Sequence, residues 1–179
     1  MTKNVILVDT ADNVIGEMPK LEVHQKGLLH RAFSIFIFNS TSQIVMQQRA
    51  LHKYHSGGLW SNTCCSHAAP GEILQETAHA RLKEEMGMSC DLMATIKFIY
   101  KVQCNNGLIE HEYDQIFLGY TDEPPIINTD EVSDWKYMSI DELLNDLETN
   151  ALQYTAWLKP CLTQLLNYLK KQALKTVYQ

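Results

Sequence analysis

Short apolar runs separated by turn residues occupy most of the chain and predict a β-sheet. The runs NVILV and FSIFIF are rich in β-branched and aromatic residues and are bounded by polar turns, as strands are. A further run, IVMQQR, is expected to pair back on the second as a hairpin, and an Asn-Gly pair within CNNG predicts another hairpin. The predicted strands span residues 4–8, 33–38, 44–49, 95–102, 108–120 and 132–138.

A four-residue periodicity predicts helices between and after these strands. Leu74, Ala78, Leu82 and Met86 share one face of a helix over residues 71–87, which has a glycine at each end.

Two further helices are predicted in the last forty residues. Ser139 and Glu142 have capping-box spacing at the start of a helix over residues 140–148. A closing helix over 155–172 carries Pro160 in its opening turns, where proline is tolerated or kinks the helix. Alternating strands and helices predict an α/β (α+β) fold, a mixed sheet covered by helices, in one domain over residues 1–179.

Composition and charge narrow the class of partner. The net charge of −6 and the pI near 5.6 argue against binding to nucleic acid or to a membrane surface. No apolar run approaches the length of a membrane-spanning helix, and the first run is too short for a signal peptide. Five cysteines, an odd number without secretory context, predict reduced thiols and a cytoplasmic protein. Monomer or oligomer stays open, with a monomer plausible.

Two clusters have the residue types of a metal or phosphate site. Because side chains alternate along a strand, Glu110 and Glu112 point to one face, where a cation could separate them. Together with His24, His30 and His67 they would form a nitrogen and oxygen site for Mg²⁺, Mn²⁺ or Zn²⁺. Taken singly, each histidine is more often a hydrogen-bonded or surface residue than a metal ligand. The two carboxylates by themselves more often belong to a solvated face of the sheet.

The second cluster combines helix and loop charges. Glu84 and Glu85 share a helix face with Arg81, although such charges are usually only solvated. Basic side chains that could meet a diphosphate held by Mg²⁺ are Lys20, Arg49 and Lys53, with ordinary solubilising charge as the alternative.

Longer motifs resemble a known family. Residues 66–88 resemble a Nudix box, the G-x5-E-x7-R-E-U-x-E-E-x-G-U signature of diphosphate-handling enzymes, with matches at Glu72, Leu82, Glu84, Glu85, Gly87 and Met88. Ser66 replaces its first glycine, and Ala80-Arg81 replaces its Arg-Glu pair. HRAFSIFIF, QQRALHKYHSGGLWSNTCCSH, GLIEHEYDQIF and YTAW resemble the type I isopentenyl-diphosphate isomerases more narrowly. The resemblance runs from about Lys20 to Trp157 and implies a Nudix-type mixed sheet sandwiched between helices.

The resemblance also implies residue roles. Cys65, Glu112 and Tyr100 would be catalytic, with Cys64 only packing. The substrate diphosphate would meet Mg²⁺ held by Glu85. Residues implied to bind the substrate are Lys20, Arg49, Lys53, Arg81 and Trp157. Residues implied to hold the other divalent ion, Mn²⁺, Mg²⁺ or Zn²⁺, are His24, His30, His67, Glu110 and Glu112.

These roles suit the movement of a double bond through a tertiary carbocation. Glu112, beside Tyr100, would protonate the alkene, and Trp157 would offer its ring to the cation, although a tryptophan here could also simply pack the core. Cys65, its pKa lowered by nearby cations, would take the second proton. A Nudix hydrolase of a nucleoside or other diphosphate is the alternative, and a metal-stabilised binding module without catalysis is a third interpretation.

Overall fold

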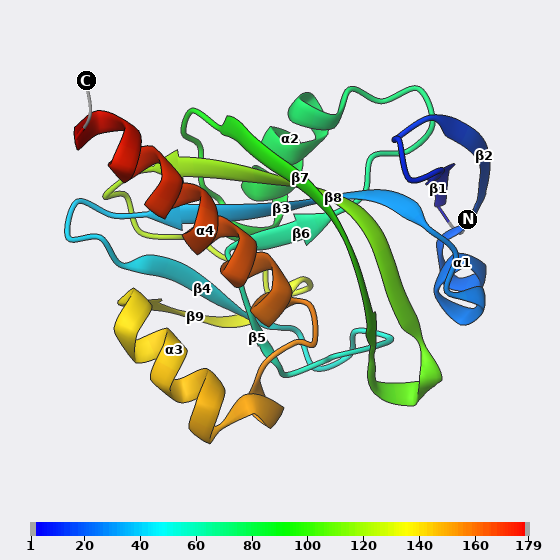
Figure 1. Ribbon diagram of the computed structural model, residues 1–179. Coiled ribbons are helices and arrows are strands. Elements are labelled where there is room, and N and C mark those ends of the chain that lie inside the picture. The colour runs from blue at the N-terminus through cyan, green and yellow to red at the C-terminus, as the bar shows by residue number, and fades with distance from the viewer. Residues whose placement is uncertain (1–2, 178–179) are drawn as a thin grey trace.

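The structure is a computed structural model that describes residues 3–177, with β3 at the centre of a mixed β-sheet (Figure 1). The strands are β1 (Asn4–Val8), β2 (Val14–Pro19), β3 (His30–Phe38), β4 (Ile44–Arg49), β5 (Trp60–Ser61), β6 (Cys64–Ser66), β7 (Met93–Gln103), β8 (Ile109–Tyr120) and β9 (Val132–Met138). The helices are α1 (Lys20–Lys26), α2 (Leu74–Met86), α3 (Ile140–Thr149) and α4 (Leu158–Val177), with short 3-10 turns at Asn105–Gly107 and Ala151–Gln153.

β3 organises the sheet because almost every residue along it is buried. It pairs in parallel with β8, from His30 opposite Glu112 to Phe38 opposite Tyr120. Its other edge pairs antiparallel with β1, β6 and β4 in turn. The sheet is therefore mixed, as the sequence predicts.

Helices cover both faces of this sheet. Because side chains alternate along β3, Phe36 and Phe38 pack with α3 and α4, whereas Phe33, Ile35 and Ile37 pack with α2. Figure 1 shows α4 crossing one face while α2 lies behind the other. The predicted sandwich of a mixed sheet between helices is confirmed.

Strand register brings chemistry-bearing residues together at one end of β3. His30 lies opposite Glu112 on β8, and Tyr100 on β7 lies opposite the same glutamate. On the other edge of β3, Ser34 lies opposite Cys65 of β6. Four strands thus fix the relative positions of a histidine, a carboxylate, a phenol and a thiol.

Several predicted boundaries differ from the observed ones. The helix predicted over 71–87 begins at Leu74, because Gly71 has a φ of +83° and Ile73 is extended. It ends before Gly87 as predicted, where a Cβ would come within 2.3 Å of the Ile126 carbonyl oxygen.

The central strand is longer than predicted. The predicted hairpin after it pairs at one position only. β3 begins at His30, so this histidine lies in the strand rather than before it. β3 and β4 pair only at Phe38 and Ile44, after which β4 pairs with β9 and β5. β2, α1 and β5 were not predicted. None of the helices within residues 3–177 has both the length and the hydropathy needed to cross a bilayer.

Candidate active site

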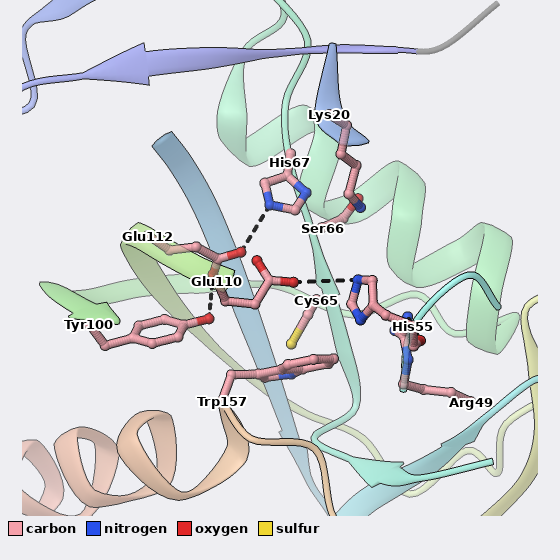
Figure 2. Close-up of a pocket in the computed structure, with 10 residues that line it drawn as sticks. All are labelled: Lys20, Arg49, His55, Cys65, Ser66, His67, Tyr100, Glu110, Glu112 and Trp157. Atoms are coloured by element: carbon pink, nitrogen blue, oxygen red, sulfur yellow. Dashed lines mark hydrogen bonds and ion pairs between the residues drawn. The ribbon is translucent and has the colours of Figure 1, made fainter. Parts of the chain in front are cut away.

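A small cavity opens where α1, β6, β7, β8 and the segment before α4 converge. Figure 2 shows Glu112 and Tyr100 entering it from one side and His55 and Arg49 from the other. The lining residues are Lys20, Arg49, His55, Cys65, Ser66, His67, Tyr100, Glu110, Glu112 and Trp157. Eight of these ten residues were predicted to bind substrate or metal or to be catalytic. His55 and Ser66 were not.

The five predicted metal ligands meet beside this cavity. One donor atom from each lies within 4.8 Å of the others, and all five side chains are buried. α1 supplies one histidine, β3 another, and the residue after β6 the third, while β8 supplies both carboxylates. The members of this cluster are His24, His30, His67, Glu110 and Glu112.

Hydrogen bonds orient two of the imidazoles toward the middle of the cluster. Nδ1 of His24 lies 2.6 Å from the Lys20 carbonyl oxygen, and Nδ1 of His30 lies 2.9 Å from that of Leu28. A carbonyl oxygen only accepts, so each Nδ1 carries the proton. In the neutral rings, each Nε2 therefore presents a lone pair to the cluster, which is the arrangement of metal-binding histidines.

Two of the inner atoms, on His24 and Glu110, lack the hydrogen bonds that would explain their closeness. Nε2 of His24 and Oε2 of Glu110 are 2.7 Å apart, yet neither has a partner in hydrogen-bonding geometry. Nε2 of His30 lies 3.1 Å from Nε2 of His67. Burial, followed by the neighbouring His67, lowers the pKa of His30 to about 3, so its ring is neutral. Imidazoles and carboxylates converging in this way fit a divalent cation.

Glu112 is held at both of its carboxylate oxygens. The Tyr100 hydroxyl donates to Oε2 at 2.5 Å, and Nε2 of His67 lies 2.9 Å from Oε1 (Figure 2). Burial raises the pKa of this carboxyl group, although the bonds from Glu110 and Tyr100 oppose that shift. Burial and the Glu112 charge also keep the pKa of Tyr100 well above its ordinary value, so Tyr100 stays a phenol that donates.

Cys65 is fixed in place as a half-buried thiol. Its S–H donates to Oδ1 of Asn62 at 3.0 Å, and Sγ lies 3.5 Å from the Ser34 hydroxyl. The Asn62 amide nitrogen bonds two backbone carbonyls, which turns its oxygen toward the thiol. Burial raises the pKa of Cys65 to about 12. The expectation that nearby cations lower this pKa is therefore wrong, because burial dominates and the charges that act on the thiol are the carboxylates of Asp114 and Glu112, which raise the pKa further.

Trp157 both packs the core and lines the cavity. It is 4% exposed, and its indole N–H donates to the Ser61 hydroxyl at 3.0 Å. The Arg49 guanidinium lies 5.2 Å from its ring centre, and the His55 ring meets it edge-on at 5.7 Å. The two interpretations of this residue are thus compatible.

The predicted phosphate-binding residues divide into two groups. Lys20 and Arg49 line the cavity itself. Arg81 lines an adjoining hollow with Lys20, Ser66 and His67. Its guanidinium pairs with Glu84 at 2.8 Å and with Glu85 at 2.5 Å.

The structure does not bring Lys53 or Glu85 to the wall of the cavity. Lys53 forms an ion pair with Glu131. The buried Glu85 lies on α2 and accepts from the Gln47 amide at 3.1 Å as well as from Arg81. Cys64 packs fully buried against the α2 side of the sheet, as expected.

Three residues near the site were missed by the sequence analysis. His55, 4% exposed, places Nε2 3.4 Å from Oε1 of Glu110. Asn62 orients the thiol, and Ser66 ends β6 opposite Phe33, where the strand does not require a glycine. The sequence offered one signal for His55 and Asn62, which is that both are polar residues shortly before the CCSH stretch. Only tertiary contacts show which groups they face.

Comparison with known proteins places the chain in a family. A model described as NUDIX domain matches residues 28–158. The isopentenyl-diphosphate Delta-isomerase of Pectobacterium atrosepticum is 51% identical over 164 residues, 92% of each chain. Isopentenyl-diphosphate Delta-isomerase 2 of Aromatoleum aromaticum is 47% identical over 167 residues, 93% of this chain and 88% of the relative. The crystal structure of DR0079 from Deinococcus radiodurans, 15% identical, covers 90% of this chain and 98% of its own with a TM-score of 0.76.

Proposed function

The chain belongs to the isopentenyl-diphosphate Delta-isomerases of the Nudix superfamily, and from that premise we propose how its residues divide the reaction. The enzyme interconverts isopentenyl and dimethylallyl diphosphate. One proton is added to the terminal alkene carbon and another is lost from the carbon two positions away, so the overall composition does not change. The intermediate is a tertiary carbocation, which needs a positioned acid, a stabilising surface and a base.

Lys20 and Arg49 bind the diphosphate end of the substrate, with Arg81 reaching it from the adjoining hollow. Lys20 and Arg49 line the cavity, and Lys20 also lines the hollow that contains Arg81, which supports this role. Mg²⁺ bound through Glu85, when present, neutralises part of the diphosphate charge. Lys53 is paired with Glu131 outside the cavity wall, so it takes no direct part in binding the diphosphate.

Glu112 is the acid that protonates the alkene, and Tyr100 positions it. The observation that carries this assignment is the hold on both carboxylate oxygens inside a buried cavity. The raised pKa of this carboxyl group favours its protonated form, which is the form that can donate to an alkene held against it. His24, His30, His67, Glu110 and Glu112 would hold a divalent ion, which would supply positive charge next to the two carboxylates.

The indole of Trp157 faces the carbocation and keeps water away from it. An aromatic face attracts a cation, by about 2 kcal/mol or more where water is excluded. Arg49 already lies over this ring at 5.2 Å, which supports its use as a cation-binding surface. Exclusion of water matters because water would trap the carbocation as an alcohol.

Cys65 exchanges the second proton. A C–H bond beside a carbocation is strongly acidic, so a modest base is sufficient. The pKa of about 12 describes the thiol before any positive charge is near it. The carbocation that develops beside Sγ favours the thiolate, because nearby positive charge lowers a thiol pKa. In the reverse direction the same neutral thiol is the acid.

Hydrolysis of a diphosphate by this site is disfavoured. In the Nudix box, Ala80-Arg81 replaces the Arg-Glu pair, and a half-buried cysteine in the cavity has no part in hydrolysis. If the protein were a binding module without catalysis, the fixed acid and thiol would have no function. We place the enzyme in the cytoplasm, in agreement with its five free thiols.

Purified protein incubated with isopentenyl diphosphate tests this function directly. Dimethylallyl diphosphate is expected to form in the presence of Mg²⁺, and formation is expected to stop after chelation and to return when the ion is restored. Absence of conversion with both Mg²⁺ and Mn²⁺, in folded protein, would contradict the proposal.

A further inference from the structure

A second group of metal-binding atoms adjoins the first and shares one residue with it. His55, Cys104 and Glu110 each offer a donor atom, and these atoms lie within 4.8 Å of one another. All three side chains are buried. His55 comes from the loop between β4 and β5, Cys104 directly follows β7, and Glu110 lies on β8. Strand pairing and a loop far away in sequence therefore build this group together.

The two oxygens of Glu110 face different partners. Oε2 lies 2.7 Å from Nε2 of His24 and 3.9 Å from Nε2 of His30. Oε1 lies 3.4 Å from Nε2 of His55 (Figure 2). Oε2 is buried without a hydrogen-bond partner. A carboxylate that directs its oxygens to two sets of donors has the geometry of a ligand that bridges two cations.

The spacing and orientation of the new donors suit a small tetrahedral ion. Zinc bonds of about 2.0–2.3 Å place neighbouring ligand atoms roughly 3.5 Å apart, close to the distance between His55 and Glu110. Nδ1 of His55 lies 3.2 Å from the Ser56 hydroxyl, which can accept its proton and leave Nε2 free to bind. The Cys104 backbone is held by a bond from its N–H to the Leu108 carbonyl at 2.8 Å.

The donor set indicates which ion it takes. Thiolate, imidazole and carboxylate together are characteristic ligands of Zn²⁺, whereas Mg²⁺ prefers oxygen alone. We propose that His55, Cys104 and Glu110 form a second divalent-cation site for Zn²⁺, bridged through Glu110 to the His/Glu site. Lys20 and Arg49 oppose a cation here, and burial raises the pKa of the Cys104 thiol to about 12, so binding of the ion must displace the thiol proton and add the thiolate charge to that of Glu110.

Cobalt spectroscopy reports this site separately from catalysis, because Cys104 gives this site a thiolate ligand and the His/Glu site has no cysteine among its five residues. The full chain, kept in Mg²⁺, is titrated with Co²⁺ while the thiolate-to-cobalt charge-transfer band is recorded. We expect the band to saturate at one thiolate-bound Co²⁺ per chain and to disappear when Zn²⁺ displaces it. Absence of the band in the parent protein would overturn the proposal, whatever the isomerase activity.

Matched variants assign the band to one cysteine. Cys104→Ser is expected to abolish it, whereas Cys90→Ser and Cys65→Ser are expected to keep it. His55→Gln should raise the Co²⁺ concentration needed for half-saturation at least about tenfold, because one of three ligands is lost. Circular dichroism verifies that each variant is folded. A band that survives Cys104→Ser, or that vanishes in Cys65→Ser, would assign the thiolate elsewhere and reject the site.

Discussion

At the scale of single residues, Glu112 shows how neighbours prepare a carboxyl group for proton transfer. Its two oxygens contact Tyr100 and His67, and its register with His30 follows from the pairing of β8 with β3. None of these contacts depends on substrate. The position of the acid is therefore set before the alkene arrives, which is how positioning contributes to rate.

Tyr100→Phe tests the hydrogen bond to Glu112. Loss of the 2.5 Å bond removes one hold on the acid without opening a cavity. We expect kcat to fall about 10- to 100-fold with little change in KM, because the bond acts on proton transfer. Steady-state kinetics measures both constants. An unchanged kcat in Tyr100→Phe would show that Tyr100 has no positioning role.

The adjacent cysteines offer a matched pair for the second proton. Cys65→Ala is expected to lower kcat at least about 100-fold while substrate binding is nearly retained. Cys64→Ala removes a buried sulfur from the α2 side of the core, so it should cost about 1–2 kcal/mol of unfolding free energy and remain active. Kinetics, calorimetric binding and chemical denaturation separate these effects. Exchange of the two phenotypes would place the thiol one residue earlier.

The raised pKa of Cys65 predicts low reactivity in the substrate-free protein. A pKa of about 12 leaves roughly one thiolate in ten thousand at pH 8, and the thiolate is the reactive form. Iodoacetamide should therefore label Cys65 slowly at pH 8, and faster as the pH rises toward 12. Peptide mass spectrometry measures the rate, with denatured protein as the control. Rapid labelling of the folded protein at pH 8 would contradict a half-buried, protonated thiol.

At the scale of elements, the sequence predicts those parts whose signal is local. The strands at 44–49 and 132–138 have the predicted boundaries, and the capping box at Ser139 and Glu142 is present with both of its hydrogen bonds. β2 has no buried residue, so alternation could not reveal it, and α1 has only seven residues. Local patterns fail where an element owes its place to tertiary contacts.

The same limit applies to the candidate site. The five predicted metal ligands lie together, as predicted. This prediction was possible because the family resemblance relates residues that are far apart in the sequence; the five are His24, His30, His67, Glu110 and Glu112. His55 and Asn62 stand in a loop and next to a short strand, and their partners come from β8 and β6. No periodicity in the sequence reports such partners. The pKa of Cys65 was predicted in the wrong direction because burial cannot be read from neighbouring residue types.

The capping box of α3 gives a test confined to one element. Ser139→Ala removes the hydroxyl that accepts from the Glu142 N–H, so the free energy of unfolding should fall by about 1 kcal/mol. Activity should not change, because α3 lies outside the cavity. Thr163→Ala on an exposed turn of α4 is the control and should change stability by less than about 0.5 kcal/mol. Equal effects of the two changes in urea denaturation would argue against the cap.

At the scale of the whole molecule, the His/Glu cluster joins distant parts of the chain. Its ligands come from α1, β3, β8 and the residue after β6, so an ion bound there connects the amino-terminal segment to the centre of the sheet. Such binding stabilises the folded state only, by about 2.7 kcal/mol at an ion concentration one hundred times Kd. That residues 1–179 form one domain stays a prediction.

His67→Ala tests this connection. The variant is expected to bind less metal and to melt at a lower temperature than the parent protein. Addition of a chelator should lower the melting temperature of the parent and leave the variant nearly unchanged. Elemental analysis and calorimetry give the two readouts. Full metal occupancy in the variant would remove His67 from the ligand set.

Deuterium incorporation tests the central claim that this site protonates carbon and leaves the diphosphate intact. The protein is incubated with isopentenyl diphosphate and Mg²⁺ in D2O, and the products are analysed by NMR and phosphate assay. The proposed division of roles between Glu112 and Cys65 predicts deuterium in the methyl groups of dimethylallyl diphosphate and no release of phosphate or pyrophosphate. Phosphate release without deuterium on carbon would contradict it and would make the protein a hydrolase.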